Sequence, residues 1–167
     1  SVATTNITEA DTPASADVTF DVSSTASISE DLTETATFTV TLGGDPLTGG
    51  VTASVDINAT GTALSGTDYD NFVAAIAAVA TATTGVSFDG TDTLTFDATF
   101  NGGTGTGAFN FTVDAIDDAA VEGTETIIAT LSNESGVNGS AALGTASTTT
   151  NVTATEADVT FDVSSTA

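Results

Sequence analysis

Residues Ala16–Ala26 read ADVTFDVSSTA, and the same eleven residues return as Ala157–Ala167, at an offset of 141 positions (from 16 to 157). The flanking sequence agrees as well, because TTNIT at Thr4–Thr8 precedes the first copy and TTNVT at Thr149–Thr153 precedes the second. Identity of this length within one short chain indicates an internal repeat. We therefore divide the chain into the last strand of a preceding repeat with a linker (1–15), one full unit (16–156) and the first strand of the next repeat (157–167).

The composition is that of an acidic β-protein. The 167 residues include 23 Asp and Glu but no Lys, Arg, His, Cys, Met or Trp, which gives a formal net charge of −23. Hydrophobic residues make up 40% of the chain, too many for an acidic disordered segment. Nucleic acids and anionic membranes are bound through Lys and Arg, so neither is an expected partner. No apolar run is long enough for insertion into a membrane, and divalent cations are the expected neutralising partner.

Short segments of alternating polar and apolar residues predict most of the fold. Val18, Phe20 and Val22 alternate with Asp and Thr, which is the pattern of a half-buried strand. Similar segments, separated by Gly-rich turns, follow at 35–42, 51–57, 94–100, 108–116, 126–131 and 143–153. About seven to eight such strands predict an all-β antiparallel sandwich. We expect its core to contain Phe38, Val40, Val55, Leu94, Phe96, Phe111, Val113, Ile127 and Leu131.

Residues 71–82 (NFVAAIAAVATA) break this alternation. Phe72, Val73, Ile76 and Val79 recur at helical spacing in an Ala-rich run, and Asp70 is a suitable N-cap. The segment therefore predicts one short helix inserted into the sandwich.

Two segments carry motifs of a known family. Residues 61–69 read GTALSGTDY, and residues 115–133 read AIDDAAVEGTETIIATLSN. They resemble two consecutive signatures of Calx-beta domains, and Ser29-Glu30-Asp31 resembles the early acidic turn of that family. The resemblance covers most of 17–158 and implies an immunoglobulin-like β-sandwich, a domain found in tandem in exchanger regulatory loops and in large extracellular adhesins.

The resemblance also implies a Ca²⁺ site at one end of the sandwich. Carried over by position, the ligands are Glu30, Asp117, Asp118, Glu122 and Glu125, joined by Glu156 and Asp158 or, at the equivalent upstream junction, by Glu9 and Asp11. The residues support this independently, because Ca²⁺ takes about six to eight oxygen ligands on flexible loops, and an empty carboxylate cluster would repel itself.

Two observations weigh against a full set of ligands. Thr60 and Ala119 stand where the family often has Asp, so the sites are expected to be fewer or weaker. The alternative is that these acids only solvate a loop tip and cap turns. Asp68 and Tyr69 are expected to be structural, with Asp68 in a turn and Tyr69 packed in a corner of the sandwich.

The repeat and the composition favour a structural or adhesive unit of an extracellular filament, sheath or giant surface protein. Its partners would be copies of itself, joined head to tail through the terminal strands Val2–Thr8 and Val159–Val163, with glycans or cell surfaces as further partners. Calcium at the junction would stiffen the joint. The alternative is a calcium-sensing regulatory Calx-beta module, which would use the same acids.

An enzyme is not expected. Without His, Cys, Lys or Arg, only chemistry by a pair of carboxylates remains, as in glycosidases. Such sites also need aromatic side chains to stack on sugars, and Tyr69 is the only Tyr in a chain without Trp.

Asn-x-Ser/Thr triplets indicate surface glycosylation only weakly in a chain this rich in Thr. Asn133 and Asn138 are the preferred acceptors because they lie in the Gly/Asn/Ser-rich segment 132–140, which is expected to be a loop.

Overall fold

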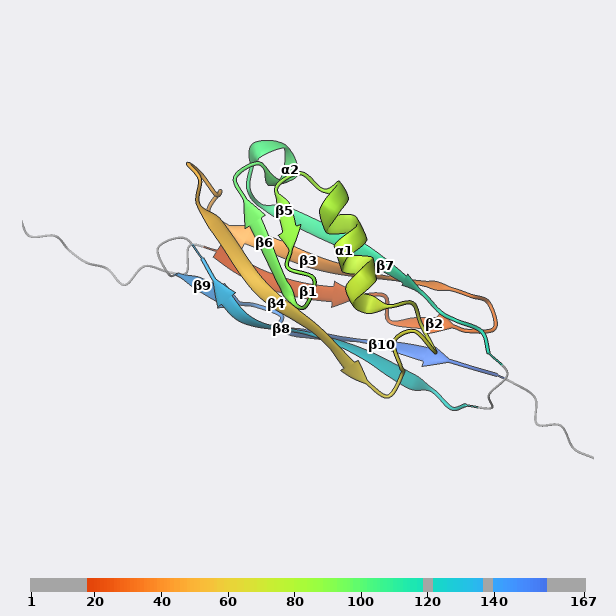
Figure 1. Cartoon of the computed structure of the whole chain (residues 1–167). Helices are drawn as coiled ribbons and strands as arrows, with labels where there is room; N and C mark the ends of the chain where they lie inside the picture. Colours follow the sequence, from red (N-terminus) through yellow and green to blue (C-terminus); the bar gives the residue numbers. More distant parts are fainter. Residues whose placement is uncertain (1–17, 119–121, 137–139, 156–167) are drawn as a thin grey trace, which may run out of the picture.

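The computed structural model describes residues 18–118, 122–136 and 140–155, which form a sandwich of two β-sheets (Figure 1). In chain order the elements are β1 (Val18–Ser24), β2 (Ser27–Ser29), β3 (Thr35–Gly44), β4 (Thr52–Gly61), α1 (Phe72–Ala82), β5 (Val86–Phe88), β6 (Thr93–Asp97), α2 (Phe100–Gly103), β7 (Gly107–Asp114), β8 (Glu125–Ser135), β9 (Ala141–Leu143) and β10 (Ser147–Thr153). One sheet has the strand order β7-β3-β1-β9, and the other has the order β2-β10-β8-β4-β6-β5. The predicted immunoglobulin-like β-sandwich with a short inserted helix is confirmed.

The predicted antiparallel pairing fails at two places. The three-residue strands β9 and β2 pair in parallel with β1 and β10, respectively. The reason is that the segments β1–β2 and β9–β10 run side by side in the same direction, and each crosses from the four-stranded sheet to the six-stranded one.

The crossing also divides the strand predicted at 143–153 into β9 and β10. At this point the N–H of Gly144 donates to the carbonyl oxygen of Phe20 at 2.9 Å, and the N–H of Thr145 donates to Asp21 Oδ1 at 2.6 Å. A Cβ atom at Gly144 would lie only 2.3 Å from Asp21 Oδ1, so a larger residue here would displace the Asp21 carboxylate that accepts the Thr145 N–H. The break is therefore set by contact with β1.

The core follows the alternation of the strands. All nine residues predicted to be buried have at most 2% of their surface exposed. Phe38 of β3 and Phe111 of β7 stack with their ring centroids 5.5 Å apart, and Phe72 of α1 meets both rings edge-on at 5.3 and 5.1 Å. The aromatic cluster thus joins the inserted helix to the four-stranded sheet.

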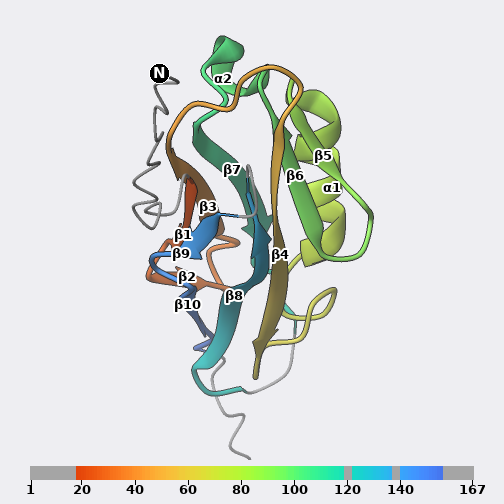
Figure 2. The ribbon, with the colours of Figure 1, turned by 90° about the vertical axis from the view of Figure 1, so that its left-hand side faces the viewer.

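Helix α1 packs against β5 and β7, which are edge strands of the two sheets, and covers that side of the sandwich (Figure 2). Its N-cap is Asn71, whose Oδ1 accepts a hydrogen bond from the N–H of Ala74 at 2.9 Å, and not Asp70 as predicted. Its buried face is Phe72, Ile76 and Ala80, and the predicted Val73 lies outside it with 39% of its surface exposed.

Several strand ends differ from the sequence prediction, above all those of β4, which continues to Gly61 and not 57, of β6 and of β8. Strand β6 ends at Asp97 because the Asp97 carboxylate accepts hydrogen bonds from the N–H and the hydroxyl of Thr99, at 2.7 and 2.6 Å, and turns the chain into α2. Strand β8 continues to Ser135, into the first part of the expected loop 132–140, with Asn133 in a left-handed conformation (φ 52°). Within the described part of the chain, no helix is long and apolar enough to cross a membrane.

The packing of Phe111 gives a direct test of the two faces of β7. Phe111→Ala should lower the free energy of unfolding by about 3–5 kcal/mol, because a fully buried ring leaves a cavity. Thr112→Ala, at the neighbouring exposed position on the opposite face, should change it by about 0.5 kcal/mol or less. Denaturation in urea measures both values. A loss below about 1 kcal/mol for Phe111→Ala would contradict this packing.

Candidate metal centre

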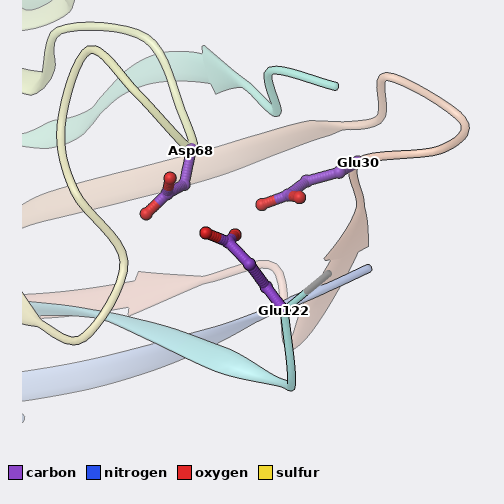
Figure 3. A group of neighbouring side chains, drawn as sticks. All are labelled: Glu30, Asp68 and Glu122. Atoms are coloured by element: carbon purple, nitrogen blue, oxygen red, sulfur yellow. The ribbon is translucent and has the colours of Figure 1, made fainter. Parts of the chain in front are cut away.

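Three carboxylates converge at one end of the sandwich, here called the exit end because β10 finishes there. Glu30 follows β2, Asp68 lies in the loop between β4 and α1, and Glu122 lies in the connection between β7 and β8. One carboxylate oxygen from each lies within 4.8 Å of the other two, and the three side chains point toward one another (Figure 3). Three segments that are distant in the sequence thus build one acidic centre.

Glu30 is held by backbone contacts on both sides. Its N–H donates to the carbonyl oxygen of Thr153 at 3.0 Å, and its own carbonyl oxygen accepts from the N–H of Thr33 at 2.8 Å. The residue is only 2% exposed. A charged side chain is buried to this degree only rarely, and then with partners for its charge or its oxygen atoms.

Asp68 is positioned by the loop 61–69. Asp68 Oδ2 accepts a hydrogen bond from the N–H of Leu64 at 2.5 Å, and the Asp68 N–H donates back to the carbonyl oxygen of Leu64 at 2.9 Å. The loop begins at Gly61, where φ is +126° and a Cβ atom would lie 2.0 Å from the carbonyl oxygen of Thr126, so only glycine fits. It ends at Tyr69, which is 2% exposed. Asp68 itself is 4% exposed.

Glu125, the first residue of β8, borders this centre. Its Oε2 atom is buried and accepts no hydrogen bond within the described residues. Burial raises the pKa of Glu125 from its ordinary value of 4.5 to about 6, and the neighbouring carboxyl groups of Asp68 and Glu122 act in the same direction. Negative charge at Glu125 is therefore unfavourable unless a cation is near.

The donor set indicates which cation fits. Every side-chain ligand at this centre is a carboxylate oxygen, and the chain contains no Lys, Arg or His that could neutralise it. Hard divalent cations, Ca²⁺ above all, prefer oxygen-only sites of flexible geometry. Glu30, Asp68 and Glu122 could hold such an ion, with Glu125 beside them.

The predicted ligands divide into three groups. Glu30, Glu122 and Glu125 come together at the exit end. Asp117 and Asp118 are exposed and do not belong to the group of three converging carboxylates. The remaining predicted acids, Glu156, Asp158, Glu9 and Asp11, lie outside the described residues.

Asp68 was expected to serve only a turn, and the structure gives it this role together with a place in the acidic centre. The signal that could have revealed it is its isolation, because Asp68 is the only charged residue in the loop 61–69.

The preferred glycosylation acceptor Asn133 lies in β8 and not in a loop. Its side chain is exposed, but its Nδ2 atom donates a hydrogen bond to Asp56 Oδ2 at 2.7 Å. The second acceptor, Asn138, lies outside the described residues. Neither position is tested by the structure.

The pKa of Glu125 predicts a pH dependence of stability in the absence of metal. Because the folded state holds this proton up to a pH of about 6 while the ordinary value is 4.5, the folded state binds more protons between these pH values, and the free energy of unfolding falls as the pH rises through them. Glu125→Gln should remove this part of the decrease. Urea denaturation in the presence of a chelator measures this decrease. The measurements cover pH 4 to 7, which is roughly the range over which the shifted pKa of Glu125 acts.

Glu134→Gln, at the other end of β8, is the matched control. It should leave the decrease in the free energy of unfolding between about pH 4 and 7 as it is in the parent chain. Identical pH profiles for Glu125→Gln and the parent chain would contradict the assignment.

No family model and no curated protein matches the sequence. Among solved structures, the apo form of the Calx CBD1 domain is similar over 83% of this chain and 98% of that chain, with a TM-score of 0.53 and 20% identity. CBD12 from CALX1.2 matches 82% of this chain and 44% of its own, with a TM-score of 0.49 and 20% identity. The calcium binding domain CBD12 of CALX1.1 matches the same shares with a TM-score of 0.43 and 18% identity. The first of these likenesses, together with the motifs, shows that the chain has the β-sandwich fold of Calx-beta domains.

Proposed function

We propose that this chain is a Ca²⁺-binding structural repeat of an extracellular or cell-surface protein, in which units follow one another head to tail. A cation at the exit end stabilises each unit and stiffens its joint with the next. The observation that carries the proposal is the convergence of buried Glu30 and Asp68 on Glu122 in a chain without any base.

The acidic centre supports the cation. Carboxylates a few ångströms apart repel one another, and burial strengthens the repulsion because the local dielectric constant is low. In most proteins an Arg or Lys side chain neutralises such a group of carboxylates, but this sequence contains neither residue. An external divalent cation removes the repulsion and satisfies the buried Oε2 atom of Glu125 or its neighbours.

The course of the chain supports the head-to-tail arrangement. β1 begins at Val18, opposite Gly44 at the far end of β3, which we call the entry end. β10 finishes at Thr153, beside Ser29 at the exit end. The chain therefore enters at one end of the unit and leaves at the other, so successive units can follow one another in a line.

The repeat supports the same arrangement. The first copy of VTFDVSS forms β1, which is hydrogen-bonded by β3 on one side and by β9 on the other. This place in the unit is therefore filled, and the second copy, within Ala157–Ala167, belongs by its sequence to the first strand of a following unit. The two units can be linked covalently or by strand donation between subunits.

A hollow beside the inserted helix offers no catalytic group. It measures about 240 Å³ and lies between α1 and β5. Its lining consists of Ala77, Ala80, Thr81, Thr83, Val86, Ser87 and Phe88, none of which is an acid or a base at neutral pH. A binding and structural role is accordingly preferred over an enzymatic one.

Calcium should stabilise the folded chain. Binding to the folded state alone raises the free energy of unfolding by about 2.7 kcal/mol at 100 times the dissociation constant, so the melting temperature should rise with Ca²⁺ and fall with chelator. Asp68→Asn should abolish most of this rise, because the amide keeps an acceptor for the Leu64 N–H but loses the negative charge. Thermal melts and titration calorimetry measure stability and binding.

Asp45→Asn is the matched control, since Asp45 is an exposed acid at the entry end, and it should retain the response to Ca²⁺. The proposal is wrong if the parent chain shows neither bound calcium by calorimetry nor any change of its melting curve.

A further inference from the structure

Among the described residues, the large apolar side chains with the most exposed surface lie in segments of the exit end. Within the described part of the chain, three of them stand out, with exposed fractions of 70% for Leu32, 61% for Leu64 and 39% for Val73. Isolated exposed leucines are common on protein surfaces. Here, however, the exposed apolar residues coincide in one region, which is typical of a contact surface.

Hydrogen bonds place each of these residues at the exit end. Leu32 lies in the turn closed by the bond from the Thr33 N–H to the Glu30 carbonyl oxygen, 2.8 Å. Leu64 donates its N–H to Asp68. Val73 lies in the first turn of α1, where the N–H of the preceding residue donates to Ser65 Oγ at 3.1 Å. We call Leu32, Leu64 and Val73 the exit patch; Leu32 and Leu64 lie in the turns that carry Glu30 and Asp68 of the acidic centre.

The reach of the chain identifies what can cover the exit patch. The hydroxyl of Thr155 donates to Asp31 Oδ2, so the chain at Thr155 is still beside the turn that holds Leu32. By the repeat, Val159 corresponds to Val18, the first residue of β1, and it follows Thr155 by four positions. Four residues span at most about 14 Å. The entry end of a following unit must therefore begin close to the exit patch.

The charge distribution favours the entry end over a second exit end as the partner. Among the described residues, the acids of the exit end are Glu30, Asp31, Glu34, Asp68, Asp70, Asp114, Asp117, Asp118, Glu122 and Glu125, whereas Asp45, Asp97 and Glu134 lie toward the entry end. Two exit ends would bring the acidic centres together, and like charges at close range repel. Contact between an exit end and an entry end avoids this repulsion.

We infer that the exit patch is a docking surface for the entry end of the following copy of this unit. The inference rests on the tandem arrangement of the proposed function, but the apolar contact does not require the cation. Leu32 and Leu64 supply the contact area, and the acidic centre beside them accounts for the effect of Ca²⁺ on the joint.

The test uses a two-unit protein made by continuing Ala167 into a second copy of Ser27–Ala167, so that Ala157–Ala167 becomes the first strand of the second unit. Since the chain has no Cys, Asn58→Cys in each unit gives one spin label on the exposed face of each β4. Pulsed electron resonance then measures the distribution of distances between the two units, with Ca²⁺ and with chelator.

The docked joint should give a narrow distribution in Ca²⁺. Leu32→Ser with Leu64→Ser in the first unit should broaden it by about twofold or more, because domains without an apolar interface move freely. The same two substitutions in the second unit are the matched control: they change the stability of a unit equally, but they lie at an exit end that no unit follows. The control should leave the distribution narrow.

Three outcomes decide the matter. A distribution that is broad in the parent protein, or equally narrow in both leucine variants, overturns the docking surface. Broadening confined to the first-unit variant supports it, even if calorimetry of the single chain finds no bound Ca²⁺, in which case the proposed metal site alone is wrong. If Ca²⁺ binds but the leucine substitutions do not change the distribution of distances, the proposed metal site stands and the docking surface is rejected.

Discussion

The structure depends on how 23 carboxylates are accommodated without a single positive side chain. Along the sandwich, carboxylates are stabilised by neutral hydrogen-bond donors, which are backbone N–H groups and hydroxyls. Asp89 Oδ1 accepts three backbone N–H groups at 2.8–3.1 Å, which lower the pKa of Asp89, and the hydroxyl of Thr99 lowers that of Asp97 in the same way. At the exit end, burial and the neighbouring carboxyl groups instead raise the pKa of Glu125. The surroundings of each carboxylate thus decide whether its charge is stabilised by local hydrogen bonds, as at Asp89, or made less favourable by burial, as at Glu125.

Much of the fold could be predicted because burial in a two-layer sandwich follows a period of two residues. Val18, Phe20 and Val22 are buried for this local reason. The division of 143–153 into β9 and β10 could not be predicted, because it is caused by the contact of Gly144 with Asp21, more than a hundred positions away in the sequence. Short parallel edge strands such as β2 also depend on the neighbour they meet and carry little signal of their own.

The acidic centre was only partly predictable for a related reason. The motif around Glu122 and Glu125 marked the correct connection, but sequence spacing gave the adjacent Asp117 and Asp118 equal weight. Which acids turn inward is decided by the path of the loop, and Asp68 enters the centre because its carboxylate is fixed by the N–H of Leu64. Its isolation in the loop 61–69 marks Asp68 as unusual, but it does not distinguish a carboxylate that only closes a turn from one that also joins a shared site.

The adjacency of the first and last strands has a mechanical consequence. Buried Thr150 of β10 donates its hydroxyl to Ser24 Oγ at 3.0 Å and to the carbonyl oxygen of Thr25 at 2.6 Å, while the hydroxyls of Ser24 and Thr148 are 2.9 Å apart. A tensile force applied between Val18 and Thr153 would therefore run along neighbouring strands. The ladders of β1 with β3 and β9, and of β10 with β8 and β2, lie across this direction. Their hydrogen bonds would be loaded in shear and would have to fail together, so the geometry resists stretching along the axis of a chain of units.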